Sequence, residues 1–87
     1  MKFEEIRDVI LEIIMEIDED ANFNNLKPDQ ALRDQLDLDS MDFLDIVMEL
    51  RKRFNIEVPE KDYGHLATMT SCVTYLQPLL KDRQLAG

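Results

Sequence analysis

The segment 40–54 carries hydrophobic residues on two opposite faces of one predicted helix, and this pattern constrains the fold more than any other feature. With residues placed about 100° apart around the helix axis, one stripe has the width of a core-facing surface. It consists of Phe43, Ile46, Val47, Leu50 and Phe54. Met41, Leu44 and Met48 form a second stripe on nearly the opposite side. A helix packed on one side cannot bury both stripes. Either the preceding loop covers the second one, or it is ordinary scattered surface, or a partner protein docks on it.

Hydrophobic residues also recur at helical spacing over 3–17, with acidic residues on the other side. The segment 18–39 then forms a long connection, which is unusual in a small domain unless hydrophobic side chains hold it to the core. The candidates for this role are Phe23, Leu26, Leu32, Leu36 and Leu38. Within this connection, 28–33 is expected to form one turn of helix.

Two further helices complete the predicted fold. A short one runs over 60–64 and ends at Gly64, which can adopt the left-handed backbone conformation. Thr68 caps the last helix, and Pro78 should kink or end it because proline cannot donate to the helical ladder. The final residues, 81–87, are expected to fray. The prediction is an all-α fold, a small irregular four-helix bundle with three main helices, one short helix and a long first loop.

Length and charge narrow the functional classes. The chain has 87 residues, enough for a single domain over 1–87. Its 19 acidic and 10 basic residues give a net charge of −9, which repels nucleic acids and anionic membranes and favours partners with basic patches. The lone Cys72 cannot form an internal disulfide, and no signal sequence or membrane-length apolar run is visible. The expectation is a monomeric cytoplasmic protein that binds no nucleic acid and has no membrane span.

Ser40 lies where an acidic loop meets the start of the helix over 40–54. A serine at this position can cap the helix by accepting a hydrogen bond from a free backbone N–H. The start of a helix also carries partial positive charge, which stabilises an anion attached to that hydroxyl. The sequence therefore predicts that Ser40 caps this helix, and it leaves open whether its hydroxyl also carries a phosphate-linked group.

A calcium site is a poor match to the sequence. Asp18-x-Asp20-x-Asn22 begins like a calcium-binding loop. However, Phe23 stands where that loop needs glycine, and Asp29 stands where it needs a bidentate glutamate. No metal site is therefore expected.

An enzyme could use Cys72, His65 and a carboxylate. Cys72 falls on the apolar face of its predicted helix, and the single His65 has the position of a surface or core-edge residue. These positions disfavour nucleophilic catalysis. A non-catalytic acidic adaptor with the same helical fold remains the serious alternative.

Three motifs stand at characteristic distances along the chain. They are Leu36-x-x-Asp39-Ser40-Met41 at the start of the helix over 40–54, Phe54-x-Ile56-x-Val58-Pro59 after it, and Tyr75-Leu76 in the last helix. Over the span 31–76, this set resembles the acyl carrier protein family, also called phosphopantetheine-binding or thiolation domains, and the helix over 3–17 fits as well. An Asp-Ser pair alone occurs often by chance, whereas this combination in an acidic chain is specific.

The resemblance implies that Ser40, between Asp39 and Met41, is the attachment site of 4′-phosphopantetheine. A phosphopantetheinyl transferase would pass this group from coenzyme A to the hydroxyl, and the thiol at its end would carry acyl groups as thioesters. The protein is then a carrier and not an enzyme. An acyl-loading ligase or transferase would load it. It would then present its cargo to synthase-type enzymes of fatty acid, polyketide or related lipid biosynthesis. An aminoacyl or peptidyl carrier, or the unmodified adaptor, stays as the alternative.

Two sets of residues are expected to contact partners and cargo. Synthase-type enzymes would dock on the second stripe and its charged border, which we call the docking stripe: Met41, Asp42, Leu44, Asp45, Met48, Glu49 and Lys52. The resemblance also implies that a growing acyl chain lies between the helices. The lining candidates, each equally explained as ordinary core, are Ile46, Val47, Leu50, Phe54, Val58, Leu66, Cys72 and Leu76.

Three departures from the family pattern bear on partner choice. Asp37 stands where glycine is common, although aspartate tolerates the left-handed conformation. Met41 replaces the usual leucine. Arg51-Lys52-Arg53 is basic where carriers of fatty acid synthesis are usually acidic. Basic charge suits a helix C-terminus, but it also makes one end of the docking surface basic. Together with Asp62-Tyr63-x-x-Leu66, this predicts a specialised stand-alone carrier with its own enzymes, in a dedicated acyl, polyketide or aminoacyl pathway.

Overall fold

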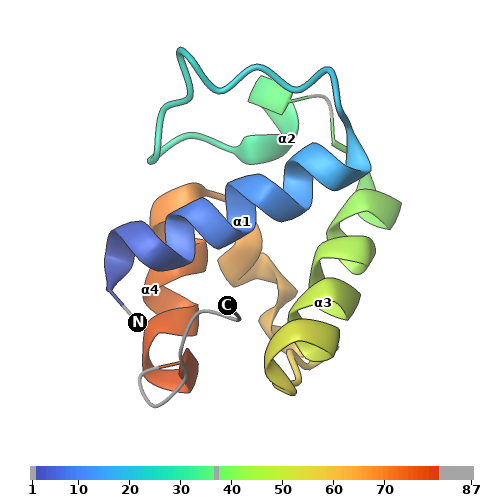
Figure 1. Cartoon of the computed structure of the whole chain (residues 1–87), viewed down its shortest axis with the longest axis vertical. Helices are drawn as coiled ribbons and strands as arrows, with labels where there is room; N and C mark the ends of the chain where they lie inside the picture. The colour runs from blue at the N-terminus through green and yellow to red at the C-terminus, as the bar shows by residue number, and fades with distance from the viewer. Residues whose placement is uncertain (1, 37, 81–87) are drawn as a thin grey trace.

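Helices joined by loops make up the structure, a computed structural model that describes residues 2–36 and 38–80 (Figure 1). In chain order the elements are α1 (Phe3–Ile17), α2 (Leu32–Leu36), α3 (Ser40–Phe54), the 3-10 helix η1 (Glu60–Leu66) and α4 (Met69–Leu80). α1 crosses the view between α4 and α3 and contacts both, while η1 packs against α4. The all-α prediction is confirmed, with α2 as an additional short helix in the first loop.

The core lies where the inner faces of α1, α3 and α4 meet. Each helix contributes buried hydrophobic residues spaced three or four apart, as amphipathic helices must. They are Ile6, Val9, Ile10, Ile13 and Ile14 from α1, Ile46, Leu50 and Phe54 from α3, and Met69, Cys72, Val73, Leu76 and Leu80 from α4. Among the described residues, no polar or charged residue belongs to the buried class. Burial of apolar surface is therefore what holds the helices together.

The first loop is held to the core by the hydrophobic residues predicted for this role. Leu32, Leu36 and Leu38 are buried, and Phe23 and Leu26 are half-buried against the same cluster. The Thr70 backbone N–H also donates to the Pro28 carbonyl at 2.9 Å. This bond ties the loop to the start of α4.

The helical turn within this loop is α2 at Leu32–Leu36, so the turn expected over 28–33 was placed wrongly. Leu32 and Leu36 are one turn apart and both buried, so a helix at these bounds places both leucines in the core. The side-chain amide of Gln35 donates to two carbonyls of the preceding turn, at 2.9 and 3.0 Å. These contacts tie α2 to the loop that precedes it.

Two expectations about the shorter helices were wrong. η1 does not stop at Gly64 but continues to the buried Leu66, and no described glycine has a positive φ. The left-handed position is instead Asn55, the C-cap of α3, with φ 55°, since asparagine tolerates this conformation. α4 continues past Pro78 to Leu80, so the alternative that proline ends this helix was wrong. The buried Leu80 continues the core side of that helix and offsets the loss of one backbone hydrogen bond.

Thr68 caps α4 as predicted, because the Ser71 backbone N–H donates to Thr68 Oγ1 at 3.0 Å. The fraying expected of 81–87 and the left-handed conformation considered for Asp37 concern positions outside the described residues. Within 2–36 and 38–80, none of the helices has the length and hydropathy needed to cross a membrane.

Candidate functional site

Ser40 is the first residue of α3, but it does not cap that helix. The cap is Asp39, whose Oδ1 accepts the Asp42 backbone N–H at 3.0 Å. In return, Asp42 Oδ2 accepts the Asp39 backbone N–H at 3.0 Å. Aspartate caps as well as serine, and the acidic residue three positions later completes a reciprocal capping box. The expectation that Ser40 is the cap was therefore wrong.

The consequence of this cap is that the Ser40 hydroxyl is free. Ser40 is exposed, and its Oγ makes no hydrogen bond to any described residue. It stands at the N-terminus of a 15-residue helix, where backbone N–H groups and the helix dipole favour an attached anion. Asp39 thus caps α3, and the Ser40 hydroxyl is left available for modification.

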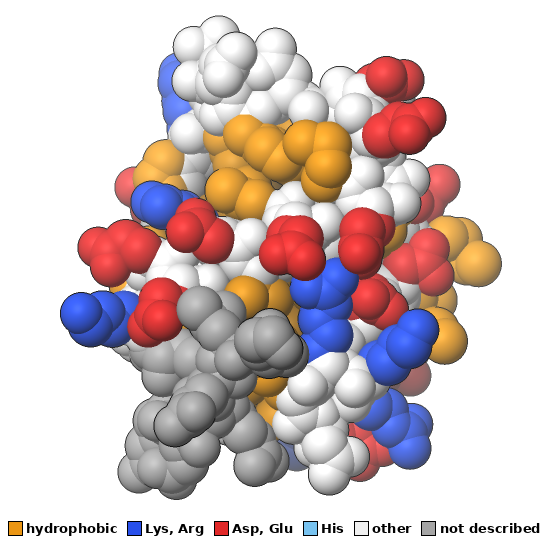
Figure 2. All heavy atoms as spheres, viewed as in Figure 1, with side chains coloured by type: hydrophobic (Ala, Val, Ile, Leu, Met, Phe, Trp, Pro, Cys, Tyr) orange, Lys and Arg blue, Asp and Glu red, His pale blue; other side chains and the backbone are white. Residues whose placement is uncertain are grey.

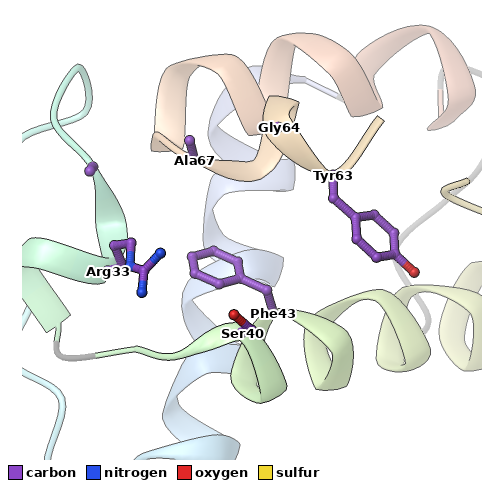
Figure 3. A pocket seen from close by; sticks show the side chains of 7 residues that line it. Arg33, Ser40, Phe43, Tyr63, Gly64 and Ala67 are labelled. Atoms are coloured by element: carbon purple, nitrogen blue, oxygen red, sulfur yellow. The ribbon is translucent and has the colours of Figure 1, made fainter. Parts of the chain in front are cut away.

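A pocket of about 300 Å³ opens beside Ser40. It is lined by residues of α2, α3 and η1 and of the connections beside them: Ala31, Arg33, Ser40, Phe43, Tyr63, Gly64 and Ala67. Figure 3 shows the Phe43 ring standing in the middle of this space and the Arg33 guanidinium pointing across it from α2. Of the described residues that line the pocket, Arg33 alone carries charge. The pocket is therefore largely apolar with one cationic side.

Sequence reasoning found only Ser40 among these lining residues as a site residue. Phe43, assigned to the core stripe, is half-buried against the core cluster and also lines the pocket. Arg33 gave no signal in the sequence, because its place beside Ser40 depends on how α2 folds back over the start of α3. The one signal in the sequence for this pocket was Phe43, a large aromatic residue about one turn after Ser40.

The second stripe of α3 is exposed, which excludes the alternative that the first loop folds over it. Met41 and Met48 are each 67% exposed and Leu44 is 38% exposed. Hydrophobic side chains project at the edge of the molecule where α3 lies, with acidic and basic side chains beside them (Figure 2). Asp45 and Lys52 are exposed as well. This face of α3 is open to a partner.

Two members of the predicted docking stripe have other tasks. Asp42 is half-buried and belongs to the capping box. Glu49 is half-buried and accepts from Arg53 Nε at 3.2 Å. The free part of the stripe is therefore Met41, Leu44, Asp45, Met48 and Lys52.

The basic triplet after this stripe is divided between two faces. Arg53 turns toward α1 and binds Glu12 at 3.2 Å and Glu16 at 2.7 Å. Partial burial by itself would lower the pKa of Arg53, but hydrogen bonds to Glu12 and Glu49 and the charge of Glu16 raise it. Only Arg51 and Lys52 are left to make the docking surface basic at this end.

The acyl-pocket candidates all pack in or against the core cluster. Val47 is half-buried and the other seven are buried, and none of the eight lines the pocket beside Ser40. Cys72 is 1% exposed, and burial raises the pKa of its thiol to about 12. A neutral, buried thiol is neither a nucleophile nor a carrier of cargo.

The residues considered for a calcium site and for an enzyme active site have structural roles instead. Asp18 Oδ1 accepts the Asp20 backbone N–H at 3.1 Å, so the calcium-like segment forms a local turn. No group of three or more metal-ligating side chains comes together in the described part of the chain. His65 stacks on Tyr75 with ring centroids 4.9 Å apart. The Tyr75 hydroxyl donates to Asp62 Oδ2 at 2.8 Å, and burial together with this carboxylate raises the pKa of Tyr75 to about 12.

Comparison with known proteins agrees with this geometry. A family model described as the phosphopantetheine attachment site matches residues 4–76. An acyl carrier protein of Campylobacter hominis is 35% identical over 81 residues, which cover 93% of this chain and 96% of that protein. An acyl carrier protein of Chlorobium luteolum is 31% identical over 72 residues, covering 83% of this chain and 91% of that protein. A meromycolate extension acyl carrier protein of Mycobacterium leprae is 32% identical over 84 residues, covering 97% of this chain and 72% of that protein. The chain therefore belongs to the acyl carrier protein family, whose members are carriers rather than enzymes and use 4′-phosphopantetheine as their prosthetic group.

Proposed function

We propose that this protein carries acyl groups as thioesters on a 4′-phosphopantetheine arm attached to Ser40. Its partners would be enzymes of fatty acid, polyketide or related lipid biosynthesis. One observation carries the assignment: the Ser40 hydroxyl is exposed, has no hydrogen-bond partner among the described residues, and stands at the N-terminus of α3. The names of the relatives support acyl cargo over aminoacyl cargo.

The residues around Ser40 fit this group. Attachment creates a phosphodiester, and the N-terminus of α3 stabilises the negative charge. When attached, the arm supplies the thiol that forms the thioester. Because Cys72 is buried, the chain itself offers no competing exposed thiol in its described part. The chain's own task is to hold the arm and to present it.

The test is loading in vitro. We expect the wild-type protein, incubated with coenzyme A and a broad-specificity phosphopantetheinyl transferase, to gain the mass of one 4′-phosphopantetheine group. Intact-mass spectrometry measures the gain, and peptide fragmentation should place the group on Ser40. A protein that folds but gains no mass would favour the unmodified adaptor.

We also propose that partners dock on the free part of the stripe on α3. Asp45→Lys is the sharpest probe, because Asp45 is exposed and, unlike Asp42, takes no part in the helix cap. A charge at the rim of an interface chiefly affects association rates. We expect loading by the transferase to slow by roughly threefold to tenfold, while the helical content stays unchanged.

Asp29→Lys makes the same change of charge in the exposed loop beside Pro28, which is tied to the start of α4. Loading rates of this control should stay close to those of the wild type. Equal rates for both variants would show that net charge, and not the docking stripe, sets the rate.

A further inference from the structure

We propose that Arg33 binds the phosphodiester of the arm, and that the pocket between α2, α3 and η1 holds the part of the arm next to the phosphate. This inference rests on the proposed attachment at Ser40. It goes further in naming Arg33 as the residue of this chain that holds the phosphate of the arm.

Geometry places the phosphate beside Arg33. Phosphorus in the attached group is bonded directly to Ser40 Oγ, so the phosphate oxygens must lie at the edge of the pocket that Ser40 lines. Arg33 lines the same pocket from α2, and its guanidinium points toward Phe43 and Ser40 (Figure 3). The backbone of α2 is held by the buried Leu32 and Leu36. Arg33 is thus an exposed side chain on a fixed base.

Charge pairing singles out Arg33 among the arginines of the described residues. Arg7 pairs with Asp8 at 3.2 Å, Arg51 with Glu57 at 3.9 Å, and Arg53 with a cluster of glutamates. Arg33 has no carboxylate partner in the described part of the chain. Its planar set of N–H donors matches a phosphate in a bidentate manner, so an unpaired guanidinium here is available for one.

The surroundings of Ser40 make such a cation useful. Asp39 and Asp42 flank the serine, and their carboxylates are committed to the capping box. A phosphodiester at Ser40 is repelled by these two charges while it is attracted by the N-terminus of α3. Arg33, on the other side of the phosphate, shifts this balance toward attraction.

The apolar part of the pocket fits the next segment of the arm. In pantetheine, a carbon bearing two methyl groups follows the phosphate ester by one methylene. Phe43, Tyr63 and Ala67 present apolar surface beside Ser40 within a volume of about 300 Å³. The methyl groups would lie against the Phe43 ring, and the amide chain with its thiol would extend toward the mouth of the pocket.

The experiment compares loaded wild-type protein with loaded Arg33→Gln and Arg51→Gln variants by NMR. In the wild type at low salt we expect cross-peaks between the arm's methyl protons and the Phe43 ring. In Arg33→Gln these cross-peaks should weaken by at least about threefold and the phosphorus resonance should shift, because a charge-assisted contact is lost. Arg51→Gln, a matched exposed arginine on α3, should leave both signals as in the wild type. High salt should weaken the wild-type cross-peaks.

Intact mass separates the two ways of failing. A wild-type protein that takes up no arm contradicts the proposed function itself. A protein that loads fully but shows no cross-peaks to Phe43, or the same spectra with Gln as with Arg at position 33, leaves the carrier function standing and overturns the role of Arg33. Arg33 is exposed, so circular dichroism should show the Gln variant folded.

Discussion

Replacing Ser40 with alanine is expected to abolish attachment of 4′-phosphopantetheine completely while leaving the fold intact. The hydroxyl is the proposed nucleophilic oxygen, and Ser40 is the only serine or threonine among the described residues that line the pocket. The side chain makes no hydrogen bond to a described residue, and Asp39 caps the helix in its stead. Alanine is also well tolerated inside a helix. We therefore expect Ser40→Ala to lose attachment of the arm without losing stability.

Intact-mass spectrometry after incubation with coenzyme A and transferase measures the loss, and thermal unfolding checks the fold. The chain has one other serine, Ser71, whose hydroxyl donates to the His65 carbonyl at 2.6 Å and accepts the Thr68 backbone N–H at 3.3 Å. Ser71→Ala should lose about 1 kcal/mol of stability, because these side-chain hydrogen bonds are lost, but it should load fully. Loading of Ser40→Ala, or failure of a folded Ser71→Ala to load, would contradict the assignment.

Leu50→Ala is expected to lower the free energy of unfolding by about 2–5 kcal/mol. Leu50 is 0% exposed and belongs to the core cluster, so truncation leaves a cavity in the core. The total stability of a small domain is roughly 5–15 kcal/mol, so the variant will be close to unfolding. Urea denaturation followed by circular dichroism gives the difference.

Leu44→Ala removes the same atoms from the opposite face of the same helix. Leu44 is 38% exposed, and its truncation should change stability by no more than about 0.5 kcal/mol. It should instead slow loading, because it removes part of the docking stripe. Similar losses of stability at both positions would mean that the two faces of α3 are not distinct.

The strongest local patterns predicted the long helices and their inner faces. α1 and α3 were expected over 3–17 and 40–54, and the structure has them at those bounds. Their hydrophobic residues repeat over about four turns each, so the period identifies both the helix and its buried side. The same count predicted that Met41 and Met48 do not face the core, but only the structure showed that the first loop leaves them exposed.

The short elements could not be placed in this way. α2 has five residues and η1 seven, which is too few turns for a period to be read. Their positions depend on Leu32, Leu36 and Leu66 reaching a core built by the long helices. Of the two effects expected of Pro78, a kink or an end of α4, the end did not occur, because the local preference of proline was outweighed by burial of Leu80.

By itself, the sequence determined the two-faced helix, the family and Ser40 as the candidate for modification, because all three depend on neighbours along the chain. The tertiary structure decided which charged and aromatic side chains are free to act. Arg53 binds Glu12, 41 residues away, and is withdrawn from the docking surface. Arg33 and Phe43 come together beside Ser40 only because α2 folds over the start of α3. A charge is paired or left free according to distances between elements, and those distances exist only after the core has formed.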